Sequence, residues 1–495
     1  MLVEKRKDLG HQRALIKDYL ISMLIIRFAV LVSLGLVPLS AGAAGSAGIP
    51  IEHVIFIIQE NHSFDNYFGT YPQANGIPAG TKLAEFPGGP LVRQPFLTSA
   101  KTIPRDLPHT FLAARVAYHD GAMDGFLWSE FPAGYRYYGR GIPVPTPDPK
   151  LVKTKPKGTQ TAHGSVRLSE EALSPHGFAD DEDADAPEIE EQNDAAASAE
   201  LSKNGPPKGR PSWSDWTISY VDYNVIPNYW EYARKFTLCD AFFSSLSGPS
   251  QPNHLYAVAA QSGGLANNLP LREAAIYSFP SVIELLGNAQ ISWKYYSGQK
   301  PSVESLWTPL PGFKEYANDP SLMSHLASTE TFLQDIKNGH LPQVCWITPS
   351  LLNSEHPPQN IQNGMWYVTG LINAVMQSSY WANCAIIVAW DDYGGFYDHV
   401  PPIQTDKFGF GFRVPALVIS PYSRSGAVIH TTYDLTSPLK LIETKFGLSS
   451  LTARDGSSNT MLECFDFTQQ PLPPDIIEKT TKLDFSEMPP SKPNP

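Results

Sequence analysis

The sequence is poor in cysteine and in charge, and it has no basic excess. Four of its 495 residues are cysteine, and no two have CxxC spacing, which argues against a zinc cluster. Only 17% of the residues are charged and 42% are hydrophobic, a balance too apolar for a disordered protein. Lys and Arg number 37 against 49 Asp and Glu, so the basic footprint of a nucleic-acid-binding protein is missing.

The formal net charge of -12 comes from one segment. Residues 168–202 contain twelve Asp or Glu and no Lys or Arg, so the rest of the chain is neutral. A basic, Pro-rich stretch precedes this acidic run. We therefore interpret residues 143–211 as a low-complexity insertion that is exposed to solvent. Residues 467–495 are again rich in proline and are expected to form a tail on the surface.

The N-terminus has the pattern of an export signal. Residues 28–39 are apolar, follow Arg27 and precede small residues that fit a signal-peptidase site. A membrane anchor over residues 19–39 is the alternative, although Arg27 interrupts that stretch and Pro38 ends it. A start at Met23 would shorten the long leader. We assign residues 1–47 to a signal peptide or leader and expect a secreted or periplasmic protein.

Short apolar runs without alternation predict strands that are buried on both faces. These runs are residues 54–58, 291–296, 344–347, 385–390 and 414–419. Helical patterns lie between them at residues 109–119, 229–236, 281–286, 371–381 and 438–446, the last with Ser437 as a candidate N-cap. This order predicts an α/β domain around a mostly parallel sheet, with residues 48–466 forming one catalytic domain.

Polar residues follow two of the predicted strands directly. Residues 54–58 run into Glu60 and Asn61, and residues 385–390 run into Asp391 and Asp392. Sites in open α/β sheets form at the carboxyl ends of strands. Adjacent buried carboxylates are costly unless a cation or hydrogen bonds compensate them. This oxygen-rich set suits a divalent metal, and the alternative is that these residues cap strands and form turns.

Several segments together resemble a phosphoesterase family that includes bacterial phospholipases C and acid phosphatases. Residues 59–69 resemble its E-N-R-S-F-D signature, residues 248–254 its G-P-[ST]-x-P-N-R and residues 355–358 its [ED]-H-P-P. Residues 391–402 resemble its D-[ED]-x-G-G-F-Y-D-H-V-x-P. Residues 106–109 match its D-L-x-H block, upstream of M-D-G-F at residues 123–126.

The resemblance implies an alkaline-phosphatase-like three-layer sandwich and hydrolysis of phosphoesters at a metal centre. It implies that the metal ligands are Glu60, Asn61, Asp391 and Asp392, and that Ser250 is the nucleophile that forms a phosphoenzyme. The turn at residues 248–249 would place the Ser250 hydroxyl just ahead of a helix, where N–H groups can help to activate it. An N-cap serine is the alternative.

Histidines supply the remaining candidates. His109, His356 and His399 lie in the matched blocks, where they would stabilise charge on the phosphoryl oxygens or protonate the leaving group. The alternative for each is a structural hydrogen bond. His62 and His254 stand where the family has Arg, and we take them as substrate-binding candidates. If they touch phosphate, activity should favour acidic pH, whereas a structural role would only alter a hydrogen-bond network.

The sequence thus predicts an exported metal-dependent phosphoesterase. Oxygen ligands favour calcium, magnesium or manganese over copper. The expected substrate is a phospholipid or a small phosphoester. The leading prediction is a phospholipase C that acts on phosphodiesters, and the alternative is an acid phosphatase that acts on phosphomonoesters. We expect no nucleic-acid partner, and only transient membrane-surface contact if lipid is the substrate. A non-catalytic secreted binding protein of this fold is a further alternative. A serine hydrolase of carboxyl esters is a third alternative, but the sequence around Ser250 lacks the G-x-S-x-G elbow of such enzymes.

Overall fold

The computed structural model describes residues 48–129, 132–152, 209–269, 275–298, 307–486 and 488. The predicted leader at residues 1–47, with the start at Met23, lies outside the described residues, as does most of the predicted insertion. Within the described ranges, no helix is both long enough and apolar enough to cross a membrane.

A mostly parallel sheet forms the centre of the fold, as the sequence predicts. Its order is β13-β6-β12-β11-β1-β10-β8-β9, and only β12 runs antiparallel to its neighbours. The strands in chain order are β1 (His53–Gln59), β6 (Thr237–Cys239), β8 (Trp293–Ser297), β9 (Leu326–Ser328), β10 (Val344–Thr348), β11 (Cys384–Trp390), β12 (Ala416–Ile419) and β13 (Ala427–Ile429).

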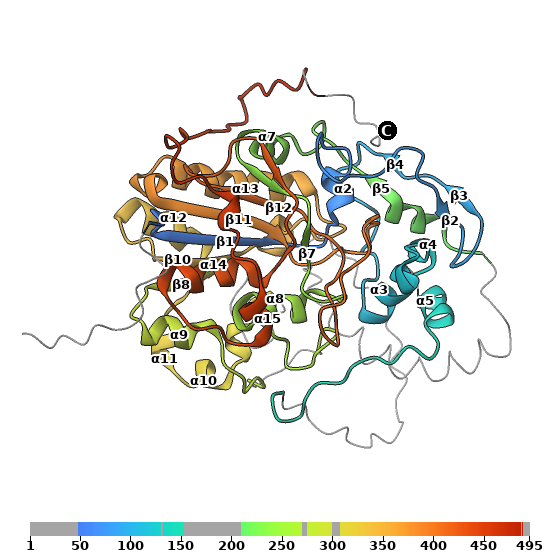
Figure 1. Cartoon of the computed structure of the whole chain (residues 1–495), viewed down its shortest axis with the longest axis horizontal. Coiled ribbons are helices and arrows are strands. Elements are labelled where there is room, and N and C mark those ends of the chain that lie inside the picture. The colour runs from blue at the N-terminus through green and yellow to red at the C-terminus, as the bar shows by residue number, and fades with distance from the viewer. Residues whose placement is uncertain are drawn as a thin grey trace, which may run out of the picture. The chain divides into compact units, whose positions relative to one another are not determined.

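Helices cover both faces of this sheet, which gives the expected three-layer α/β architecture. α7 (Pro227–Lys235) and α13 (Ile361–Met376) lie on one face, while α8 (Ser250–Ala259) and α14 (Thr436–Phe446) lie on the other (Figure 1). Every residue of β1 and β11 is buried, which explains why these strands read as continuous apolar runs.

Smaller elements surround this core. The helices are α2 (Phe64–Phe68), α3 (Phe111–Tyr118), α4 (Phe126–Ser129), α5 (Pro132–Tyr138), α9 (Val282–Asn288), α10 (Lys314–Ala317), α11 (Pro320–Met323), α12 (Thr329–Asn338) and α15 (Ala453–Ser457). Three two-stranded pairs join β2 (Leu83–Ala84) to β3 (Leu91–Arg93), β4 (Phe96–Leu97) to β5 (Ser219–Tyr220), and β7 (Phe242–Phe243) to β14 (Tyr433–Asp434).

The helix boundaries differ from the prediction by one or two residues in most cases, and the differences at α13 and α14 have a physical reason. α13 spans Ile361–Met376, whereas the sequence pattern suggested residues 371–381. Gly364 and Gly370 weaken the helical signal of its first half, and Gly364 packs against Glu355 where a larger side chain would collide. α14 begins at Thr436, so Ser437 is not its N-cap. The carboxylate of Asp434 instead accepts a hydrogen bond from the Thr436 N–H, at 3.2 Å.

The C-terminal segment and the cysteines also have defined places. Ile477 is buried, and its carbonyl accepts a hydrogen bond from the Asn373 side chain on α13. All four cysteines are buried free thiols. Cys239 and Cys464 bring their Sγ atoms to 3.7 Å from each other.

Arg413 holds together loops that are distant in the sequence. Its side chain is fully buried and donates from Nε to Asp398 Oδ1 at 2.9 Å and from Nη2 to Asp65 Oδ1 at 3.0 Å. Nη1 donates to the carbonyl oxygens of Asn75 and Asp240, at 2.8 and 2.7 Å. The two carboxylates could not be buried without this cation, because an unpaired charge in the interior is costly.

We expect Arg413→Met to lower the free energy of unfolding by about 3–5 kcal/mol, because it leaves Asp65 and Asp398 buried without their cation. Arg424→Met, at an exposed arginine, should cost less than about 1 kcal/mol. Urea unfolding followed by tryptophan fluorescence measures both. An equal loss of unfolding free energy in the two variants would contradict a special role for Arg413 with Asp65 and Asp398, the Arg413 cluster.

Candidate active site

The register of β1 and β11 brings the predicted metal ligands together. The two strands are parallel neighbours, and Gln59 pairs with Trp390, so Glu60 and Asp391 follow at the same level. The Asp391 N–H donates to the Gln59 carbonyl and the Asn61 N–H donates to Asp391 Oδ1, both at 3.0 Å. Gly394 lies against the Asn61 backbone, where a Cβ would collide with it. The loop after β11 can therefore close over the end of β1.

α8 adds Ser250 and His254 to this cluster. The two residues are four positions apart on the helix and so lie on the same face. Ser250 Oγ donates to Glu60 Oε2 at 3.0 Å and lies 3.4 Å from Asn61 Oδ1. His254 Nε2 lies 2.8 Å from Glu60 Oε1. Ser250 is the first residue of α8 and Pro249 is the N-cap, so the hydroxyl does not cap its own helix.

His109 and His356 lie together beside these residues, with ring centroids 6.1 Å apart. His109 Nδ1 is 2.7 Å from the Leu107 carbonyl, and its Nε2 is 3.3 Å from Asn61 Nδ2 and 3.9 Å from Asp392 Oδ2. His356 Nδ1 is 2.7 Å from the Pro357 carbonyl. Each carbonyl accepts the Nδ1 proton, which fixes the tautomer and assigns proton exchange to Nε2.

The buried carboxylates of this cluster need a cation to balance their charge. The side chains of Glu60, Asp391 and Asp392 are fully buried, and within the described ranges their ion-pair partners are only His254 and His109. Burial raises the pKa of Glu60 and of Asp392, and the neighbouring Asp391 raises both further. Among the described residues, Asp391 Oδ2 and Asp392 Oδ2 have no hydrogen-bond partner. Buried oxygens of this kind fit a divalent cation, which Glu60, Asn61, Asp391 and Asp392 would hold.

The Glu355 carboxylate braces the ends of β1 and β11. Its buried carboxylate accepts hydrogen bonds from Gln59, Tyr67, Tyr229 and Trp390, at 3.1, 2.7, 2.5 and 3.2 Å. Burial raises its pKa to about 7, against the opposing effect of these donors. Because Gln59 and Trp390 directly precede candidate ligands, this brace fixes the ends of β1 and β11. Glu355 belongs to the [ED]-H-P-P motif, but nothing in the sequence indicates that it joins these two strands.

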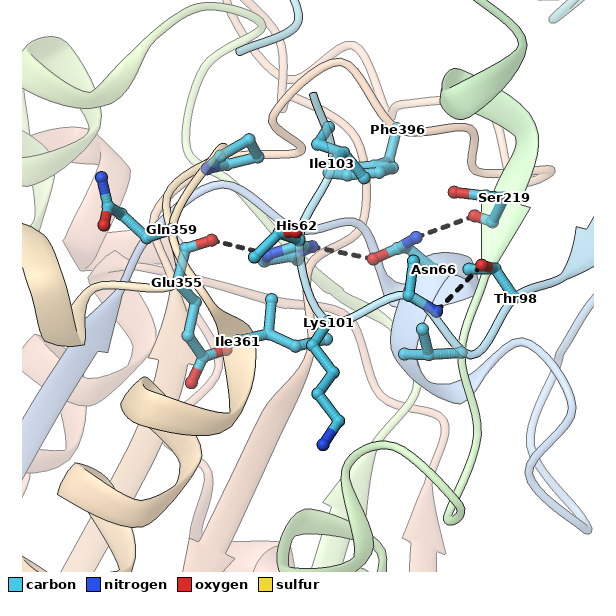
Figure 2. Close-up of a pocket in the computed structure, with 14 residues that line it drawn as sticks. His62, Asn66, Thr98, Lys101, Ile103, Ser219, Glu355, Gln359, Ile361 and Phe396 are labelled. Atoms are coloured by element: carbon cyan, nitrogen blue, oxygen red, sulfur yellow. Dashed lines mark hydrogen bonds between the residues drawn. The ribbon is translucent and has the colours of Figure 1, made fainter. Parts of the chain in front are cut away.

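His62 lies in the hydrogen-bond network of this brace. Its Nδ1 is 2.8 Å from Asn66 Oδ1 and its Nε2 is 3.1 Å from the Glu355 carbonyl. Figure 2 marks both contacts with dashed lines. The ring stacks between Tyr67 and Phe396, and burial lowers its pKa to about 4. Burial lowers the pKa of His254 to about 4 as well. Neither residue therefore carries a charge at neutral pH, and the contacts of His62 fit the structural alternative.

His399 lies in a different cluster from the candidate metal ligands. Its Nδ1 is 2.7 Å from Asp65 Oδ2 and its Nε2 is 3.2 Å from Asn75 Oδ1, next to Arg413. The sequence motif gave no sign of this, because Arg413 lies outside the blocks that resemble the family. The contacts of His399 therefore argue for a structural role in the Arg413 cluster.

The chain is similar to a known family, to relatives in sequence and to solved structures. The model of the Phosphoesterase family matches residues 51–142 and 158–449. Phospholipase C A of Mycobacterium tuberculosis H37Rv is 29% identical over 485 residues, which cover 85% of this chain and 78% of the relative. Phospholipase C B of the same strain is 27% identical over 490 residues, which cover 86% of this chain and 79% of the relative. A protein in the alkaline phosphatase superfamily from Vibrio parahaemolyticus is a structural match with a TM-score of 0.32 and 13% identity, over 48% of this chain and 64% of that chain.

We expect a divalent cation to raise the melting temperature, and the rise to grow as pH increases from about 5 to about 8. The raised pKa values of Glu60 and Asp392 mean that the cation-free fold is favoured at low pH and loses stability as these groups ionise. A bound cation offsets that loss. Differential scanning fluorimetry with EDTA or with added calcium, magnesium, manganese or zinc measures the difference.

Asp391→Asn should abolish this cation-dependent stabilisation, and Asp120→Asn, at an exposed aspartate, should leave it intact. A pH-independent response to the cation, or one that survives in Asp391→Asn, would place the cation elsewhere.

Proposed function

The chain belongs to the Phosphoesterase family and is a hydrolase of phosphoester bonds, and from that membership we propose that it is a phospholipase C-type phosphodiesterase with Ser250 as nucleophile. The observation that carries the proposal is the placement of Ser250 Oγ, 3.0 Å from Glu60 Oε2 among the buried carboxylates. Relatives named phospholipase C support the diester substrate.

In the first step, Ser250 Oγ forms a bond to phosphorus while the bond from phosphorus to the leaving oxygen breaks. The hydroxyl proton already points at Glu60 Oε2, which is its hydrogen-bond acceptor. The hydroxyl lies at the N-terminus of α8, where the helix dipole favours negative charge. A bound divalent cation would lower the pKa of the hydroxyl and draw charge from the phosphoryl oxygens.

The leaving oxygen must gain a proton, and the attacking water of the second step must lose one. His109 and His356 are placed for both transfers, because each ring is held by a carbonyl at Nδ1 and exchanges protons at Nε2. Water then breaks the bond between Ser250 Oγ and phosphorus and regenerates the hydroxyl. The products are a phosphomonoester and the alcohol that left in the first step.

We also propose that the mature chain acts after export. Support comes from the leader pattern of residues 28–43. A phospholipid substrate would then be reached outside the cytoplasm, with transient contact at the membrane surface.

Ser250→Ala should reduce hydrolysis of p-nitrophenylphosphorylcholine at least about 1,000-fold, because alanine has no hydroxyl that can attack phosphorus. Ser247→Ala is the matched control, since its buried hydroxyl lies three residues earlier and donates to the Phe410 carbonyl. Turnover is measured with this diester and with p-nitrophenyl phosphate over pH 4 to 9 (about the range in which histidines and carboxylates titrate). Turnover of the monoester alone would favour an acid phosphatase.

A second test concerns the leaving group. We expect His356→Gln or His109→Gln to lose at least about 100-fold more activity on a phospholipid than on the p-nitrophenyl diester, since p-nitrophenolate departs without a proton. His340→Gln, at an exposed histidine, should leave the activity on both substrates unchanged. Equal losses on both substrates in both variants would show that neither histidine acts as the acid.

A further inference from the structure

His254 stands inside the ring of candidate ligands. It is fully buried on α8, and its Nε2 lies 2.8 Å from Glu60 Oε1 and 3.7 Å from Asp391 Oδ2. One ligand atom from each of these three residues lies within 4.8 Å of the others. His254 Nδ1 has no hydrogen-bond partner among the described residues, so the polar contacts of the ring are with the two carboxylates.

A second observation points to the same place. Asp391 Oδ2 is the carboxylate oxygen nearer to His254 Nε2, and it is buried with no hydrogen-bond partner in the part of the chain that the structure describes. The other oxygen, Asp391 Oδ1, is occupied by the Asn61 N–H. Asp391 Oδ2 therefore lies 3.7 Å from His254 Nε2, which in turn contacts Glu60 Oε1 at 2.8 Å. A buried carboxylate oxygen without a partner is rare, and a bound ion is one of the few arrangements that explain it.

We propose that His254 Nε2 is a direct ligand of the divalent cation, so that the centre has a nitrogen donor beside its oxygen donors. The proposal rests on the metal centre of the proposed function. Imidazole favours zinc, iron or nickel over calcium and magnesium, which prefer oxygen ligands. The oxygen ligands alone predicted a preference for calcium, magnesium or manganese. A histidine ligand shifts the metal preference of the site toward transition metals.

The helix gives this ligand a consequence for catalysis. His254 lies one turn after Ser250 on the same face of α8, so a single rigid element carries both the ligand and the nucleophile. Ligation requires the Nε2 lone pair and places the ring proton on Nδ1. Binding of the cation would then fix the position of α8, and with it the distance of Ser250 Oγ from the carboxylates.

Electron spin-echo spectroscopy of the manganese-loaded protein tests the assignment without any substrate. Wild type should show the coupling of a directly bound imidazole nitrogen, which shifts when the histidines carry nitrogen-15. The coupling should vanish in His254→Gln and persist in His109→Gln, whose ring also borders the cluster. In competition experiments, His254→Gln should lose about tenfold or more in zinc affinity relative to calcium.

Circular dichroism of the cation-free variants checks that they fold, and His254→Arg, with a cationic side chain that does not ligate, gives a second loss of the nitrogen ligand. No imidazole coupling in wild type, or a coupling that survives in His254→Gln, would overturn the proposal. Failure to bind any cation, read from metal content, would overturn it together with its premise. Coupling without phosphodiester turnover would uphold the ligand and reject only the proposed substrate.

Discussion

Three carboxylates buried at one edge of a sheet, without a lysine or arginine beside them in the described part of the chain, are the constraint on which this site depends. Glu60, Asp391 and Asp392 would repel each other in the interior, so the fold must hold them by other means. Backbone pairing of β1 and β11 sets their spacing. The Glu355 brace stiffens both strands one residue earlier, where Gln59 and Trp390 donate to it.

This arrangement explains how the parts of the site divide the work. The carboxylates supply charge for a cation, and α8 brings a hydroxyl and an imidazole to the same charge. Two more histidines stand where protons must be exchanged. The Arg413 cluster lies apart and neutralises its own two carboxylates, so it stabilises the loops around the site and contributes no charge to it.

The sequence revealed the parts of the site that follow from local order. Apolar runs ending in Glu60 and Asp391 were enough to predict candidate ligands at strand ends, whereas Ser250 was identified through the resemblance of residues 248–254 to the family motif. It could not place His399 or Arg413, because their partners are hundreds of residues away in the chain. Nor could it show that His62 and His254 are buried and neutral, since burial depends on the tertiary packing of aromatic rings and α8. The first half of α13 was missed because glycine is placed there by contact with Glu355.

The central claim is that Ser250 becomes phosphorylated next to the buried carboxylates. The most direct measurement is acid quenching of the enzyme during turnover of a short-chain phosphatidylcholine, followed by peptide mass spectrometry. The account predicts one phosphorylated residue, Ser250, that disappears when turnover is complete. No phosphopeptide under conditions of rapid turnover, or phosphate on another residue, would contradict it.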